Sequence, residues 1–240
     1  MDFIVRTYQW IMRDELLTFS LVLVIVFGAW VFVSIAEEVV EGESHELDKR
    51  ILLSLRDAEN RSDPIGPTWF EEMARDITAL GSVVALMIFT ATTAGYLYFT
   101  KQPWIAVFVV IAVLSGTAMS SALKLGFNRP RPDLVPHKTR IYTKSFPSGH
   151  SAMSSIAYLT LGAVMARAER RRRAKVFLLA VPVFLLLIVG VSRVYLGVHW
   201  PTDVLAGWAF GVSWAAASWL IFELLQRRFH LNVQPESSSP

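Results

Sequence analysis

The sequence contains no cysteine, and this excludes disulfides, thiolate catalysis and cysteine-ligated metals. It is also poor in charge, since only 18% of its 240 residues are charged, against about a quarter in soluble domains. Apolar residues make up 53% of the chain. This composition excludes an ordinary soluble domain and indicates an integral membrane protein. The net charge of +3 does not indicate a nucleic acid partner, because most clustered basic residues flank apolar segments, where membrane orientation and lipid headgroups explain them.

Six segments are long and apolar enough to cross a bilayer, which takes about 20 helical residues. They are predicted near Leu17–Ala36, Thr78–Phe99, Trp104–Ala122, Gly149–Ala166, Val176–Val191 and Thr202–Phe222. The polar segment 37–76 is predicted to form short amphipathic helices on the outer membrane surface. We therefore predict an all-α fold, a bundle of six transmembrane helices that forms one domain over residues 1–231. Residues 232–240 lack an apolar pattern and are predicted to be a disordered tail.

The orientation follows from a dense basic run, Arg167–Lys175, between the fourth and fifth predicted spans. Loops rich in Lys and Arg stay in the cytoplasm, so alternation puts both termini in the cytoplasm and segment 37–76 outside. The loop 124–147 contains six further Lys and Arg residues and would lie outside, against the charge rule. We accept this placement because the run at 167–175 is denser and because two of the loop cations have a chemical role. The inverted orientation is the alternative.

Three separated stretches contain the residues suited to chemistry. They are Lys124-Leu-Gly-Phe-Asn-Arg-Pro-Arg131-Pro132, Pro147-Ser-Gly-His150, and Ser192-Arg193 followed by His199 and Asp203. Together they supply three cations, two imidazoles and one carboxylate, a set suited to phosphoryl transfer through histidine. The predicted topology puts all of them at one end of the bundle, where two helices begin and direct their N–H groups toward a bound anion. Ser148 can cap one of these helices, and Gly149 lets a phosphate oxygen approach the backbone closely.

In these three motifs the chain resembles the phosphatidic acid phosphatase type 2 superfamily, which also includes vanadium haloperoxidases and bacterial acid phosphatases. Every position of the family's three-part pattern is filled. The resemblance implies a phosphatase that needs no metal and no cofactor and, in the membrane branch, acts on lipid phosphates. It makes His199 the nucleophile that forms a phosphohistidine, Asp203 its orienting partner, and His150 the acid that protonates the leaving oxygen and then activates water. The residues implied to bind the phosphate are Lys124, Arg131, Arg193 and the backbone around Ser148 and Gly149.

The resemblance leaves the substrate open among undecaprenyl pyrophosphate, phosphatidylglycerophosphate and phosphatidate, at the outer face of a bacterial cytoplasmic membrane. Dephosphorylation of lipid A at its 1-position, or transfer of the phosphate to another lipid, would use the same chemistry. A metallohydrolase using both histidines is disfavoured, because the three neighbouring cations would repel a metal. A transporter or scaffold without catalysis is disfavoured, because the charges lie at span ends. Arg129 falls outside the pattern and has no predicted role, and the oligomeric state stays open.

Overall fold

The computed structural model describes residues 2–133 and 144–229, and the predicted tail at 232–240 lies outside them. Within these residues every named element is a helix, as the predicted all-α fold requires. The helices are α1 Asp2–Glu41, α2 His45–Ser54, α3 Thr68–Ala79, α4 Val83–Phe99, α5 Pro103–Gly126, α6 Gly149–Ala168, α7 Arg172–Tyr195 and α8 Pro201–Phe229.

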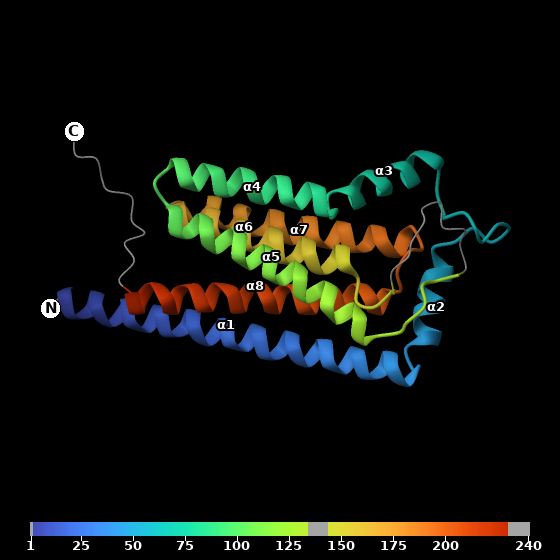
Figure 1. Cartoon of the computed structure of the whole chain (residues 1–240), viewed down its shortest axis with the longest axis horizontal. Coiled ribbons are helices and arrows are strands. Elements are labelled where there is room, and N and C mark those ends of the chain that lie inside the picture. The colour runs from blue at the N-terminus through green and yellow to red at the C-terminus, as the bar shows by residue number, and fades with distance from the viewer. Residues whose placement is uncertain (1, 134–143, 230–240) are drawn as a thin grey trace.

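The six longest helices lie side by side and run alternately in opposite directions (Figure 1). α6 packs against α5, α7 and α8, while α1 packs along α8. The two short helices, α2 and α3, lie at the end of the bundle where α5 and α7 finish and α6 and α8 begin (Figure 1). This end therefore gathers residues from separate parts of the sequence: α2, α3, the connection between α5 and α6, and the connection between α7 and α8.

The predicted count of six spans is not confirmed. Among the described residues, four helices are long and apolar enough to cross a membrane: Glu15–Glu41, Pro103–Gly126, Arg172–Tyr195 and Pro201–Arg228. A fifth arises if α3 and α4, bent by 48° at their junction, form one broken span. α6 does not reach this apolarity, because it is enclosed by other helices: thirteen of its 20 residues are buried, and several are Ser or Thr. A helix that faces protein on most sides has no need of a lipid-facing apolar surface.

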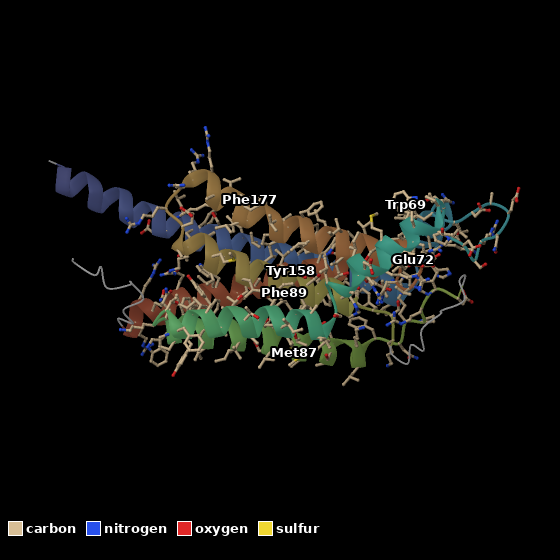
Figure 2. The ribbon with its side chains drawn as sticks, turned by 90° about the horizontal axis from the view of Figure 1, so that it is seen from above. Trp69, Glu72, Met87, Phe89, Tyr158 and Phe177 are labelled. Atoms are coloured by element: carbon tan, nitrogen blue, oxygen red, sulfur yellow. The ribbon has the colours of Figure 1, made fainter. Side chains whose placement is uncertain are left out.

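Segment 37–76 is more closely tied to the bundle than surface helices would be. Its first residues continue α1, and a turn at Gly42, with φ of +82°, leads into α2. The loop that follows is fastened to the end of α7, because the Arg56 guanidinium donates to the Tyr195 carbonyl oxygen at 2.5 Å. The Tyr195 hydroxyl in turn donates to the Ile65 carbonyl oxygen at 2.8 Å. Trp69, exposed on α3, lies at this same end of the bundle (Figure 2).

Close approach of neighbouring helices depends on small residues. Gly207 and Gly211 of α8 face α6 so closely that a Cβ on either would lie under 3.0 Å from α6 atoms. On another side of α6, Tyr158 lies beside Phe89 of α4, with ring centroids 6.1 Å apart (Figure 2). The Tyr158 hydroxyl donates to the Leu80 carbonyl oxygen at 2.8 Å and so holds the bend between α3 and α4 against α6.

Candidate active site

His199 is a buried imidazole in the short connection between α7 and α8, with 1% of its surface exposed. Its Nδ1 lies 3.2 Å from the Asp203 Oδ2, and its Nε2 lies 3.1 Å from the Arg131 Nη1. Because a guanidinium only donates hydrogen bonds and a carboxylate only accepts them, the proton belongs on Nδ1 and the lone pair on Nε2. Burial, together with the charges of Arg131 and Arg193, lowers the pKa of His199 to about 3, although Asp203 opposes this shift. The imidazole is therefore neutral at physiological pH, with its lone pair on Nε2.

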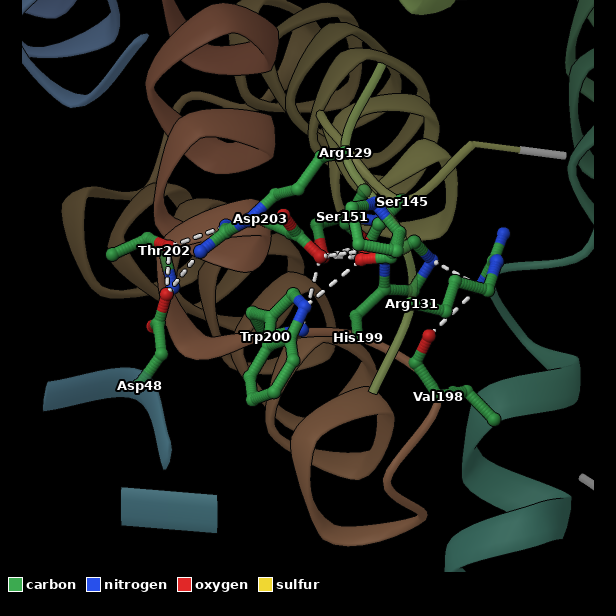
Figure 3. Close-up of polar contacts among 12 residues, drawn as sticks. Asp48, Arg129, Arg131, Ser145, Ser151, Val198, His199, Trp200, Thr202 and Asp203 are labelled. Carbon is green, nitrogen blue, oxygen red and sulfur yellow. Dashed lines mark hydrogen bonds and ion pairs between the residues drawn. The ribbon is translucent and has the colours of Figure 1, made fainter. Parts of the chain in front are cut away.

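Asp203 is fully buried in the first turn of α8 and accepts several hydrogen bonds (Figure 3). Pro201 begins the helix, which fixes the local backbone, and the Trp200 N–H donates to the Asp203 Oδ2 at 2.9 Å. The Ser145 hydroxyl donates to the same oxygen. The Arg129 Nη1 donates to the other oxygen, Oδ1, at 2.7 Å. These donors stabilise the carboxylate and aim it at the His199 Nδ1.

The predicted phosphate-binding cations come from the ends of two helices, α5 and α7. Arg131, after α5, donates to the Val198 carbonyl oxygen at 2.8 Å. Arg193, in the last turn of α7, donates to the Thr78 hydroxyl at 3.0 Å and so connects the site to α3. Lys124, in the last turn of α5, places its Nζ 3.4 Å from the position of a Cβ built on Gly149. The structure thus brings the three predicted cations around the start of α6.

His150 lies in the first turn of α6, beside the bend between α3 and α4. Its Cδ2 is 3.3 Å from the position of a Cβ built on Gly81, which shows how closely that backbone approaches. His150 interacts electrostatically with four other predicted site residues, namely Arg193, His199, Lys124 and Arg131. The two predicted catalytic histidines therefore share one cationic pocket.

Ser148 caps α6, as the sequence predicts, because its hydroxyl oxygen accepts from the Ser151 N–H at 3.4 Å. Its own N–H donates to the Asp203 main-chain carbonyl at 2.9 Å, which ties the start of α6 to the start of α8. Since this N–H is engaged, the first N–H groups of α6 that have no acceptor in the described part of the chain are those of Gly149 and His150. The predicted contact of the Ser148 backbone with phosphate stays a prediction.

Sequence reasoning missed three polar residues that contact the site, namely Arg129, Ser145 and Asp48. Arg129 falls outside the motif, which therefore predicts no role for it, yet it is bonded to both Asp203 and Asp48. No local spacing could have identified Asp48, because it precedes Arg129 by 81 residues. The sequence offers no signal for these contacts beyond the position of Arg129 beside a motif, because the burial of its guanidinium, which requires an anionic partner, is seen only in the structure.

The charges of the site suit an anion. Among the residues that the structure describes, no group of three or more His, Cys, Asp or Glu could hold a metal ion. Arg131 is hydrogen-bonded to the His199 Nε2, the nitrogen that carries the lone pair. Two further cations lie near His150. The arrangement can neutralise a bound phosphate while a histidine nitrogen attacks it.

A family profile and several known proteins match the chain in sequence. The profile of the PAP2 superfamily matches residues 102–227. Phosphatidylglycerophosphatase B of Bacillus subtilis is 30% identical over 149 residues, covering 60% of this chain and 71% of that protein. An undecaprenyl-diphosphatase of Sulfolobus acidocaldarius is 31% identical over 132 residues, covering 55% of this chain and 52% of that protein. A lipid A 1-phosphatase of Rhizobium etli is 29% identical and covers 62% of this chain and 71% of that protein.

Two solved structures share the fold. The crystal structure of a transmembrane PAP2-type phosphatidylglycerolphosphate phosphatase from Bacillus subtilis has a TM-score of 0.71 at 24% identity, covering 86% of this chain and 98% of that one. The crystal structure of LpxE from Aquifex aeolicus has a TM-score of 0.52 at 23% identity, covering 72% of this chain and 93% of that one. At these identities the likeness concerns the fold alone.

Proposed function

The chain belongs to the PAP2 superfamily, and from this premise we propose that it is a membrane lipid phosphatase that acts through a phosphohistidine on His199. It removes the terminal phosphate of a lipid phosphate or pyrophosphate. The relatives' names support this class of substrate, since they cover phosphatidylglycerophosphate, undecaprenyl diphosphate and lipid A. The observation that carries the proposal is the neutral, buried His199, whose Nδ1 is held by Asp203 and whose Nε2 faces Arg131.

In the first step the His199 Nε2 attacks phosphorus, and the bond from phosphorus to the lipid oxygen breaks. The negative charge of the bound phosphate offsets the surrounding cations, so His150 binds a proton in the complex and donates it to that leaving oxygen. The resulting phosphohistidine is cationic, and Asp203 stabilises it through the Nδ1–H. In the second step His150, now neutral, takes a proton from water. The water oxygen attacks phosphorus, inorganic phosphate leaves, and His199 is restored.

The cations stabilise the charge that develops on the three equatorial phosphate oxygens during both displacements. Arg131 has a double role in this account. It donates to the His199 Nε2 and so aims the ring, and it turns to a phosphate oxygen when the substrate binds, which releases the lone pair for attack. Arg193, Lys124 and the Gly149 N–H complete the cradle. A guanidinium suits this task because its N–H groups match the geometry of phosphate oxygens.

We place the protein in a bacterial cytoplasmic membrane as a single domain over residues 1–231, with all six long helices crossing it. The basic residues 170–173 lie at the start of α7, at the end of the bundle opposite the candidate site, where the last residues of α8 also lie (Figure 1). Positive charge favours the cytoplasm for that end. The active site then faces the periplasm or exterior, both termini lie in the cytoplasm, and segment 37–76 covers the outer mouth and selects the headgroup.

The test is phosphate release by detergent-purified protein from four lipids: phosphatidylglycerophosphate, undecaprenyl pyrophosphate, phosphatidate and lipid A. We expect release from at least one by the wild type and none above background by His199→Gln, with both proteins showing the same thermal unfolding midpoint. His199→Gln keeps the side chain polar and of similar size. Undiminished release by His199→Gln would overturn the proposed nucleophile. Transfer of label to a second lipid, without free phosphate, would assign the chain to phosphotransfer.

A further inference from the structure

The short helix α2 supplies a fully buried carboxylate, Asp48, to the region beside the active site. Its Oδ1 accepts from the Thr202 N–H at 2.9 Å, and its Oδ2 accepts from the Thr202 hydroxyl at 2.6 Å. Thr202 follows directly on the first residue of α8, so Asp48 satisfies an N–H group that the helix leaves unpaired at its start. A carboxylate from one helix thus caps the helix that carries Asp203.

Arg129 connects this carboxylate to the catalytic pair. Its Nη2 lies 2.5 Å from the Asp48 Oδ2, and its Nη1 lies 2.7 Å from the Asp203 Oδ1. The Arg129 side chain is only 9% exposed and stacks over the Trp200 ring, with its Cζ 5.7 Å from the ring centroid. Figure 3 shows the resulting chain of contacts, from Asp48 through Arg129 and Asp203 to His199.

The balance of charge among Asp48, Arg129 and Asp203 gives Asp48 a role in catalysis. Buried charges interact strongly because little water screens them. If Arg129 were paired with Asp203 alone, the two would form a neutral pair. The imidazolium that forms on His199 would then face no net negative charge. Asp48 supplies a second carboxylate, so the three groups carry one net negative charge beside His199.

We infer that Asp48 is a positioning residue that acts through Arg129: it neutralises the guanidinium and leaves the charge of Asp203 available to stabilise cationic His199. No motif of the sequence contains Asp48, and the contacts that connect it to Asp203 all pass through Arg129 or Thr202. The inference rests on the proposed phosphohistidine mechanism, because only a nucleophile that becomes positively charged needs this negative charge.

The first test is Asp48→Asn, which keeps the size of the side chain and removes its charge. We expect kcat to fall roughly 10–100-fold, by analogy with the loss of a hydrogen-bonded partner behind a metal-binding histidine or carboxylate. KM should stay within about 2-fold of wild type, because the interaction strengthens after substrate has bound. The matched control is Glu46→Gln, which removes a charge from an exposed position on the same helix and should leave kcat and KM unchanged.

The second test adds Arg129→Met to Asp48→Asn. Removing one partner of a buried ion pair leaves an uncompensated charge, whereas removing both does not. We therefore expect the double variant to recover at least about 5-fold in kcat over Asp48→Asn, since nothing then competes for Asp203. If Asp48 only docked α2 or capped α8, adding the second substitution would not restore kcat. That result would overturn the inference.

A folding failure of Asp48→Asn would not end the test. In that case the double variant is compared with Arg129→Met alone. Asp48→Asn should then change kcat less than about 3-fold, because its charge no longer acts through Arg129 and the asparagine oxygen can still accept from the Thr202 N–H. A loss of 10-fold or more in that background would refute the inference. Failure of the proposed function looks different: the wild type would release no phosphate, or a variant at His199 would stay active. A folded Asp48→Asn protein with wild-type kcat would refute only the role of Asp48.

Discussion

Replacing Gly207 by alanine should slow the enzyme strongly without unfolding it. A Cβ at this position would lie 2.7 Å from the Ser148 carbonyl oxygen and 2.9 Å from the Ser151 Cβ. Carbon atoms in ordinary contact are about 3.5–4.0 Å apart, so α8 and α6 must separate by roughly 0.6 Å or more. Rotation of a side chain cannot relieve this contact, because the crowded atoms belong to the backbone and a Cβ.

Moving α8 away from α6 would displace the site residues that these two helices carry. Ser148 and His150 begin α6, and Asp203 lies one helical turn before Gly207 in α8. The hydrogen bond from the Ser148 N–H to the Asp203 carbonyl, now 2.9 Å, would stretch. A misplacement of about 1 Å can cost roughly 100-fold in rate, so we expect kcat to fall by about 10–100-fold. Overpacking of this kind also costs about 1–3 kcal/mol of stability.

Two glycines provide controls. Gly211→Ala crowds the same pair of helices one turn farther from the site, with a Cβ 2.5 Å from the Ser155 Cβ. It should lower the thermal unfolding midpoint by a similar amount but reduce kcat less. Gly95→Ala meets nothing within 4 Å and should change neither property for the worse. Phosphate release and thermal unfolding in detergent measure both effects. Wild-type kcat in Gly207→Ala would refute the reasoning.

Three further predictions follow from the site. Ser145→Ala removes a donor to the Asp203 carboxylate and should lower kcat roughly 10-fold with KM unchanged; equal kcat would contradict the assigned contact. The pKa of His199 is lowered to about 3, below its unfolded value of about 6.5. The unfolded chain therefore binds more protons between these values, and stability rises with pH across that window. At pH 5 this linkage costs about 2 kcal/mol relative to pH 7, and pH-dependent thermal unfolding should show a shallower slope in His199→Gln, whereas equal slopes would refute it. Phosphate release should persist in chelator and be inhibited by vanadate, which mimics the five-coordinate phosphorus; activity lost in chelator and restored by zinc would exclude the metal-free mechanism.

That the site residues come together could be predicted from the sequence, because they lie at the ends of helices. Once six apolar segments alternate in direction, the motifs around Lys124, His150, Arg193 and His199 must meet at one end of the bundle. The contact between His199 and Asp203 is local as well, since they lie four positions apart across a helix start. Neither step requires knowledge of how the side chains pack.

What could not be predicted depends on packing. The length and apolar residues of α6 predict a membrane span, but the pattern does not show that neighbouring helices enclose it and that its serines face protein. The contacts of Arg129 with Asp48 and of Arg193 with Thr78 join segments 81 and 115 residues apart. A single sequence carries no local signal for such pairs.

The most direct test of the central claim is to capture the phosphoenzyme. Protein is mixed with lipid carrying a radiolabelled terminal phosphate and denatured within one turnover at alkaline pH, where phosphohistidine is stable. The label is then mapped to a residue. We predict acid-labile label on His199 of the wild type, absent from His199→Gln. Label on another residue, or no label on a wild-type protein that still releases phosphate, would contradict the account.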